Sequence, residues 1–261
     1  MTDATRRLLA VMARLRDPLH GCPWDREQDW TSIVPHTIEE AYEVAEAVRG
    51  GDPGAVRDEL GDLLFQVVFQ ARIADERGLF GFDDVANAIA DKLERRHPHV
   101  FGGETIADSA EQSRAWELHK AAERSARGEG NGVLDGVTLG LPALTRAAKL
   151  GARAAKVGFD WSDAAGVRTK VDEELGEFDA AVASGDRTHA REELGDLLFS
   201  LAQLARHLDV DPEGALRDAN AKFERRFRAM ERAAEGDQRP FERRSMEELE
   251  AMWVAAKRDA G

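Results

Sequence analysis

The sequence contains one pattern twice, and this repetition limits the possible folds more than any other feature. Residues 59–65, Glu-Leu-Gly-Asp-Leu-Leu-Phe, recur unchanged as residues 193–199, at an offset of 134 residues. A pair of glutamates precedes each run at the same distance, at positions 39–40 in the first copy and 173–174 in the second. We therefore expect two similar domains in tandem rather than one large domain.

Length and composition are compatible with two domains and a linker. The 261 residues suffice for two ordinary domains, and a hydrophobic content of 43% suffices for their cores. Glycines recur among charged residues between positions 121 and 136, which is typical of a linker. The expected boundaries are a first repeat at 1–120, a linker at 121–136 and a second repeat at 137–261.

Helical periodicity runs through both copies. Apolar residues such as Leu8, Met12 and Leu15 share a helix face, and no alternating strand pattern of useful length occurs. The expected fold class is therefore all-α, with a helical bundle in each repeat. Ser245 and Glu248 are spaced as a capping box at the start of the last helix. The expected helices cover about 4–16, 37–50, 55–77, 83–96, a segment around Trp116, a segment from about 139, one helix on each side of Gly185, one after Pro212, and 245–257.

The acidic residues of the second copy lie at helical spacings that place them on shared faces. Glu174 and Glu177 are three residues apart, as are Glu193 and Asp196. If the two helices face each other, these four carboxylates converge on one place. A set of carboxylates without histidine or cysteine suits a hard cation such as Mg²⁺ or Mn²⁺. The alternative is a solvated acidic face, which is the usual meaning of an isolated motif.

Two features favour packed helices over solvated ones. The run from Leu194 to Leu204 is among the most apolar of the chain, and we expect it to be largely buried. Gly61 and Gly195 lie inside helices at a cost of about 1 kcal/mol relative to Ala, which suggests close helix approach there. The first copy also holds a complete acidic set, and we expect it to form a second, weaker metal site. That set consists of Glu40, Glu43, Glu59 and Asp62.

The balance of charges excludes several kinds of partner. With 36 basic and 50 acidic residues, the net charge of −14 argues against general nucleic-acid binding and against binding to anionic membranes. No run of 18 apolar residues and no signal-peptide pattern occurs, so we expect no membrane span. Cys22 is the only cysteine, which gives no disulfide framework and favours a reducing compartment. We expect a cytoplasmic protein.

The motifs occur in a fixed order over nearly the full length. Besides the two acidic sets, characteristic stretches lie at 21–25, 92–101, 157–161 and 222–227. This ordered set resembles the MazG nucleoside triphosphate pyrophosphohydrolases, part of an all-α group that carries Glu-x-x-Glu, a gap and Glu-x-x-Asp. The resemblance implies MazG-like helical domains that form a homodimer, Mg²⁺ as cofactor, and hydrolysis of (d)NTPs to (d)NMP and pyrophosphate, as in sanitation of the nucleotide pool.

Hydrolysis of a triphosphate needs a charge clamp and an activated water. Glu173 lies just outside the metal set and is the residue that we expect to position the water, although the sequence leaves open which carboxylate is the base. Lys222 and Arg226 would donate to phosphates, and Trp253 would stack on the base. The nucleotide-binding set that we expect is Lys170, Glu173, Glu174, Asn220, Lys222, Arg225, Arg226 and Trp253.

We expect the second copy to carry most of the activity. A site for a triphosphate needs cationic and polar donors beyond its metals. The second copy has Lys170 where ungapped alignment puts His36 in the first. In the register that matches Lys222 with Lys92, it has Asn220 where the first has Ala90. The resemblance agrees, since tandem members rely chiefly on the C-terminal repeat.

Two other classes of protein fit parts of the pattern. A redox di-metal bundle also collects carboxylates between helices, but it carries two Glu-x-x-His motifs, and here only Glu94 to His97 qualifies. A non-catalytic all-α interaction module, with solvated acidic faces, is the other alternative. Stabilisation by Mg²⁺ in a melting experiment separates that module from a metal-dependent enzyme.

Overall fold

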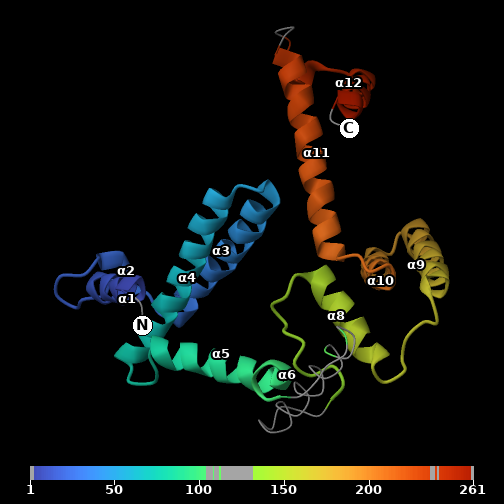
Figure 1. The fold of residues 1–261 in the computed structure, drawn as a ribbon. Coiled ribbons are helices and arrows are strands. Elements are labelled where there is room, and N and C mark those ends of the chain that lie inside the picture. Colours follow the sequence, from blue (N-terminus) through green and yellow to red (C-terminus); the bar gives the residue numbers. More distant parts are fainter. Residues whose placement is uncertain are drawn as a thin grey trace. The chain divides into compact units, whose positions relative to one another are not determined.

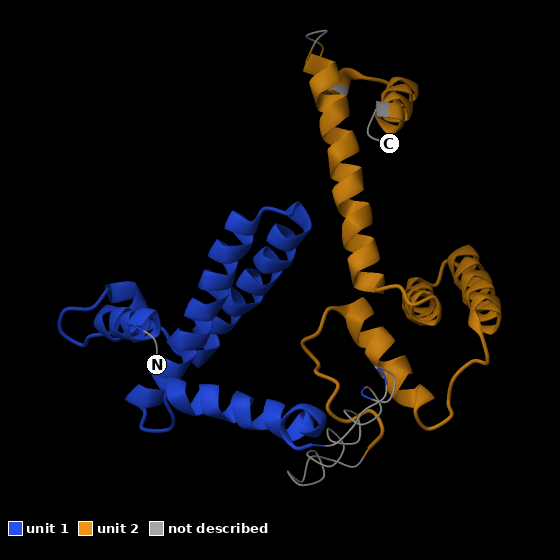
Figure 2. Cartoon of the chain, viewed as in Figure 1, with its two compact units in different colours: residues 1–119 blue, residues 120–261 orange. Residues whose placement is uncertain are grey.

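The computed structural model describes residues 3–103, 108, 112, 132–235, 239 and 241–259. Those residues form helices and no strand (Figure 1), which confirms the expected all-α class. The chain divides into two compact units, residues 1–119 and 120–261 (Figure 2). Trp116 and residues 121–131 of the expected linker lie outside the described residues. Among the helices described, none is both long and apolar enough to span a membrane.

The first unit is organised around a long hairpin of two helices. Helix α3 packs along α4, and both α1 and α5 also contact α4. Asp52 caps α4, because its carboxylate accepts a hydrogen bond of 2.9 Å from the backbone N–H of Gly54. The helices run as α1 (Asp3–Leu15), α2 (Pro23–Glu27), α3 (Trp30–Gly50), α4 (Pro53–Glu76), α5 (Phe82–Arg96) and α6 (Pro98–Phe101).

Helix α3 begins earlier than the sequence suggested. The prediction of a start near Thr37 is wrong, because the helix runs from Trp30 and includes Pro35. A capping box starts it: the Asp29 carboxylate accepts from the backbone N–H of Ser32, and the Ser32 hydroxyl accepts from the backbone N–H of Asp29, each at 2.9 Å. These bonds satisfy N–H groups that the first turn leaves free. Pro35 lies inside the helix, where its nitrogen cannot donate a hydrogen bond and its ring crowds the carbonyl one turn earlier.

The second unit repeats the hairpin with α9 and α10. Helix α10 packs along α9 and against α8, while α11 contacts α8, α10 and α12. The predicted capping box of α12 is confirmed: Glu248 accepts from the backbone N–H of Ser245 at 2.7 Å, and the Ser245 hydroxyl accepts from the backbone N–H of Glu248 at 3.2 Å. The helices run as α8 (Ala143–Ala155), α9 (Ala164–Ser184), α10 (Arg187–His207), α11 (Pro212–Glu235), η1 (Phe241–Arg243) and α12 (Met246–Asp259).

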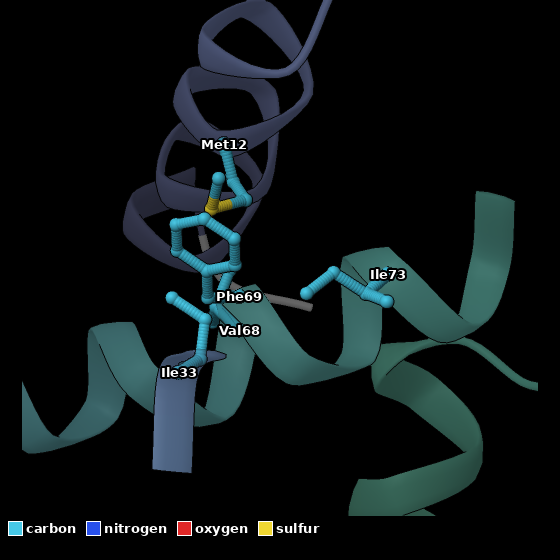
Figure 3. Close-up of a cluster of buried hydrophobic side chains, with 5 residues drawn as sticks. All are labelled: Met12, Ile33, Val68, Phe69 and Ile73. Carbon is cyan, nitrogen blue, oxygen red and sulfur yellow. The ribbon is translucent and has the colours of Figure 1, made fainter. Parts of the chain in front are cut away.

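The core of the first unit is apolar and lies where α1, α3 and α4 meet. Phe69 and Val68 of α4 pack with Met12 of α1, and Ile33 of α3 and Ile73 of α4 complete the cluster (Figure 3). Each of these five side chains is at most 1% exposed. Burying a side chain of this kind contributes roughly 1.5–3 kcal/mol, so the cluster fixes how α1 sits on the hairpin.

The corresponding part of the second unit is polar. Gln203 stands at the position of Phe69 in the repeat and is also fully buried. Its Nε2 donates to the carbonyl of Ala147 at 2.8 Å, and its Oε1 accepts from Nε of Arg206 at 2.9 Å. A Cβ at position 151 would lie 1.7 Å from that Oε1, so Gly151 is what leaves room for the amide.

Arg206 extends this network to the loop before α9. Its Nη1 and Nη2 donate to the Asp160 carboxylate at 2.9 and 2.5 Å, and Nε2 of His207 lies 2.9 Å from the same carboxylate. The hydrogen bonds from Arg206 hold the pKa of Asp160 well below its ordinary value. The network therefore ties the Asp160 loop to the end of α10.

Two expectations about close packing are wrong for the described residues. Leu194, Leu198 and Leu201 of α10 are 42%, 45% and 43% exposed rather than buried. A Cβ built on Gly61 or Gly195 would meet nothing within 4 Å. The physical reason is that α10 uses only part of its surface against α9, α8 and α11, which leaves the leucine stripe exposed among the described residues of this unit.

Candidate metal centre

The hairpin of α9 and α10 brings three carboxylates together. Gly185 turns the chain with a φ of 77°, a left-handed conformation that glycine adopts without strain, and Asp186 then caps α10. The short turn sets the two acidic helix faces side by side. Glu174, Glu177 and Glu193 each offer a carboxylate oxygen, and these oxygens lie within 4.8 Å of one another.

The hairpin of α3 and α4 builds the same group in the first unit. Gly51 turns the chain with a φ of 73°, and Asp52 caps α4. Oxygens of Glu40, Glu43 and Glu59 again lie within 4.8 Å of one another. The duplication thus extends from the sequence to the local geometry of the carboxylates.

Asp196 and Asp62 were each expected as a fourth member, and both lie outside these groups of three. Their side chains are exposed on α10 and α4. Asp62 is nevertheless near enough to Glu40 for its charge to contribute to raising the pKa of that carboxyl. In each unit, therefore, three glutamates offer grouped oxygens, and the expected aspartate, Asp62 or Asp196, is not part of the group.

In the second unit, two nitrogen-bearing side chains contact the acidic residues. Nζ of Lys170 lies 2.8 Å from Oε1 of Glu173 and 2.7 Å from Oε1 of Glu174. Both contacts raise the pKa of Lys170, and the hydrogen bond with Glu173 has the larger effect. Nε2 of His189 lies 2.9 Å from Oε1 of Glu193. Glu174 is buried and Glu193 is half-buried, so both contacts lie where solvent screens them only in part.

The carboxylates of the first unit repel one another. Loss of solvation, followed by the charges of Asp62 and Glu43, raises the pKa of Glu40. Loss of solvation and the neighbouring carboxylates also raise the pKa of Glu59. Nε2 of Gln66, a buried side chain of α4, lies 3.5 Å from Oε1 of Glu40. Nδ1 of His36, which aligns with Lys170, lies 3.7 Å from Oε2 of Glu39, the counterpart of Glu173.

The other expected nucleotide-binding residues lie on α11 and α12. Trp253 of α12 packs against Phe223 of α11, with ring centroids 5.2 Å apart. The guanidinium of Arg226 lies 6.0 Å from the centroid of the Trp253 ring. Arg226 and Trp253 are therefore grouped on a helix pair other than the hairpin that carries the carboxylates. The exposed members of the set on α11 are Asn220, Lys222 and Arg225.

Two residues in contact with the acidic groups were missed in the sequence. His189 precedes Glu193 by four residues, a helical spacing that could have identified the contact. Gln66 directly follows residues 59–65, but no helical spacing connects it with Glu40. The packing of α3 on α4 brings the two side chains together.

The donor chemistry fits a hard divalent cation. An octahedral Mg²⁺ holds its oxygens at about 2.1 Å, and these are then about 3 to 4 Å from one another. The oxygens of each group lie within 4.8 Å, so small movements suffice to close them around one ion. Both groups consist of glutamates alone, which disfavours the softer metals that take nitrogen or sulfur.

The sequence is similar to those of known proteins. The family model described as the MazG nucleotide pyrophosphohydrolase domain matches the chain twice, at residues 28–101 and 165–230. Each match includes one of the two hairpins and its three glutamates.

Several relatives extend over nearly the full chain. A protein of Escherichia coli (strain K12) named nucleoside triphosphate pyrophosphohydrolase is 48% identical over 254 residues, which cover 97% of this chain and 96% of that protein. A Thermotoga maritima protein named nucleoside triphosphate pyrophosphohydrolase/pyrophosphatase MazG is 43% identical over 256 residues, 96% of this chain and 94% of that protein. A Mycobacterium tuberculosis protein, also named nucleoside triphosphate pyrophosphohydrolase, is 41% identical over 58% of this chain and 45% of its own length.

Proposed function

The chain belongs to the MazG nucleotide pyrophosphohydrolase family, and we propose that it is a cytoplasmic, Mg²⁺-dependent hydrolase of free nucleotides. The reaction converts a nucleoside triphosphate into a nucleoside monophosphate and pyrophosphate. The observation that carries this proposal is the convergence of Glu174, Glu177 and Glu193 within 4.8 Å on one hairpin. The names of the two nearly full-length relatives support the same activity.

The glutamates of the second hairpin are the proposed metal ligands. Glu174, Glu177 and Glu193 would hold the cation, and Asp196 would join them from the next turn of α10. A bound Mg²⁺ supplies charge neutralisation at phosphate oxygens and lowers the pKa of a coordinated water. The proposed second and weaker metal site, in the first unit, consists of Glu40, Glu43, Glu59 and Asp62.

Glu173 is the proposed residue for positioning the attacking water. It is exposed beside the buried Glu174 and is not one of the three grouped glutamates. Lys170 holds its Oε1 at 2.8 Å, which limits the orientations of the carboxylate. A carboxylate held in this way can accept a proton from a water on the side that Lys170 does not cover.

The basic residues of α11 are the proposed phosphate donors. Lys222, Arg225 and Arg226 lie within two turns of one helix, with Asn220 just before them. Their side chains supply the positive charge that a triphosphate needs in addition to metal ions. Trp253, which already packs on Phe223 at 5.2 Å, offers a ring face for the base. Lys170 would complete the set from α9.

We further propose that the protein is a homodimer. The support is an apolar stripe that recurs on the second helix of each hairpin and is exposed among the described residues of its own unit. Its members are separated by four and three residues, which places them on one helix face. They are Leu60, Leu64 and Val67 on α4, at 49%, 44% and 38% exposure, and Leu194, Leu198 and Leu201 on α10, at 42%, 45% and 43%.

The reaction is tested by product analysis with a panel of nucleoside triphosphates in the presence of Mg²⁺, Mn²⁺ or EDTA. We expect monophosphate and pyrophosphate in equal amounts, and no turnover with EDTA. A nucleoside diphosphate and orthophosphate as first products would refute cleavage between the α and β phosphorus atoms. Glu177→Gln is the variant that links activity to the carboxylates, and Asp179→Asn, an exposed acid on the same helix, is the matched control.

A further inference from the structure

The second carboxylate group is flanked by a side chain that neither the family motifs nor the proposed reaction accounts for. His189 lies in the first turn of α10, one helical turn before Glu193. Its Nε2 is 2.9 Å from Oε1 of Glu193, a hydrogen-bonding distance for a nitrogen and a carboxylate oxygen. In a helix, side chains lean towards the N-terminus, so Glu193 naturally reaches back to position 189.

We propose that His189 is a positioning residue for Glu193, in the sense that its Nε2–H holds Oε1 and leaves Oε2 to face the metal ion. The inference rests on the proposed function, because it assigns Glu193 as a metal ligand. A carboxylate in a metal site has two equivalent oxygens and a freely turning terminal torsion, and an outer hydrogen bond removes much of that freedom.

The geometry around the site favours this role over that of a further ligand. The group within 4.8 Å comprises Glu174, Glu177 and Glu193 and does not include His189. The side chain of His189 is 52% exposed whereas that of Glu193 is 15% exposed, so the ring lies on the solvent side of the carboxylate. His189 thus contacts the group from its outer edge.

The arrangement has a counterpart on the facing helix. On α9, Lys170 contacts Glu174 from four residues earlier, at 2.7 Å, as His189 contacts Glu193 on α10. In each helix of the hairpin, therefore, a side chain one turn earlier contacts a buried or half-buried glutamate. The first unit has Ala55 at the position of His189, and a methyl group cannot hold Glu59 in this way.

Metal affinity without nucleotide tests the proposal directly. Free Mn²⁺ is measured by electron paramagnetic resonance, at a fixed pH of 7.5, with the full chain carrying Glu40→Gln and Glu59→Gln to weaken the first group. We expect His189→Ala to weaken Mn²⁺ binding about tenfold, the lower range for loss of an outer-sphere hydrogen bond. His189→Gln, which retains an N–H donor at the end of its side chain, should recover most of the affinity.

The nucleotide assay gives an independent readout. For His189→Ala we expect a higher Mg²⁺ concentration for half-maximal rate and a kcat near that of the parent once Mg²⁺ saturates. In the first unit of the otherwise unchanged chain, Ala55→His should tighten Mn²⁺ binding to the weaker site. This gain does not depend on the folding of the alanine variant.

Three outcomes would overturn the inference. Unchanged Mn²⁺ affinity in His189→Ala would show that the contact does not matter for the metal. Tighter binding would show that the ring competes with the cation for Glu193. Equal losses in His189→Ala and His189→Gln would show that an N–H donor is not what counts. If Glu177→Gln also leaves Mn²⁺ binding unchanged, the proposed metal site itself fails, which is a separate result.

Discussion

In the second repeat Lys170 and His189 contact acidic residues of the hairpin, whereas the first repeat has His36 and Ala55 at the same positions. The three glutamates are grouped equally closely in both. In the first group, loss of solvation, followed by the charges of the neighbouring carboxylates, raises the pKa values of Glu40 and Glu59. The comparison teaches that duplication preserved the carboxylates while the neighbours that compensate their charge diverged.

The cores of the two units differ in a second way. The first unit buries Phe69 in an apolar cluster, and the second buries Gln203 at the same position within a chain of hydrogen bonds that leads to Asp160. An apolar core tolerates changes of pH, but a network that includes an ionised carboxylate does not. The two repeats should therefore respond differently to substitution and to acid.

The largest expected difference is in catalysis. Glu174→Gln removes a charge from the buried member of the second group, and we expect nucleotide hydrolysis to fall by about a thousandfold, or about 4 kcal/mol in activation free energy. Glu40→Gln, the matched change in the first repeat, should spare most of the turnover, because that repeat lacks the cationic partner at Lys170. Initial rates at saturating Mg²⁺ measure both variants side by side. Loss of activity in Glu40→Gln with retention in Glu174→Gln would reverse the assignment of the working site.

The next difference concerns the cores. Phe69→Ala should destabilise the first unit by about 3–5 kcal/mol, because it leaves a cavity beside Met12 and Ile33. Gln203→Ala should cost the second unit about 1–3 kcal/mol, since it removes the hydrogen bonds that Gln203 makes with the Ala147 carbonyl and with Nε of Arg206. Hydrogen exchange followed by mass spectrometry reports the two units separately within the intact chain. A larger cost for Gln203→Ala would show that the polar network, and not the apolar cluster, is the stronger core.

Acid should act on the second unit through Asp160. Hydrogen bonds from Arg206 lower the pKa of Asp160 below its ordinary 3.8, so its contribution is present above that pH and is lost as the pH falls towards the lowered value. We expect Asp160→Asn to cost about 2 kcal/mol at pH 7 and progressively less below about pH 4. The pH dependence of hydrogen exchange in α9 and α10 measures this. Asp179→Asn, a substitution at an exposed position, is the control. It should change neither the stability at pH 7 nor its dependence on pH.

The sequence sufficed for those features that depend on short spacings. The helices, the capping box at Ser245 and the acidic faces each follow from residues three or four positions apart. Contacts between residues far apart in the sequence could not be predicted, because no local pattern of residues marks them. The buried amide of Gln203 needs the space that Gly151, more than fifty residues away, leaves by having no side chain.

The errors have the same origin. Periodicity shows that Leu194 and Leu198 share a helix face, but it does not show whether another helix covers that face. Gly195 breaks the local preference for helix formers, yet no described atom would lie within 4 Å of a Cβ built there. The predicted start of α3 near Thr37 is too late, since Pro35 lies inside the helix and the cap at Asp29 lies six residues before Pro35.

The smallest expected effect is on the stability of the first unit in the absence of metal. Glu40 has a raised pKa, so its ionisation weakens the fold: stability is fully present below the ordinary pKa of 4.5 and falls as the pH rises through the raised value. Glu40→Gln removes that loss. In EDTA at pH 7.5 we expect the variant to melt higher by less than about 4 °C, since much of the side chain is screened by solvent.

The comparison between repeats supplies the control for this last prediction. Glu174→Gln also removes a carboxylate from a group of three, but it takes a partner from Lys170, which then keeps only Glu173. It should therefore give no rise in melting temperature in EDTA. At pH 4 the advantage of Glu40→Gln should vanish, because Glu40 is then largely protonated in both the folded and the unfolded chain. A rise of equal size in both variants would show that Lys170 does not compensate the second group, and the contrast between the repeats would then lie in the nucleotide-binding residues alone.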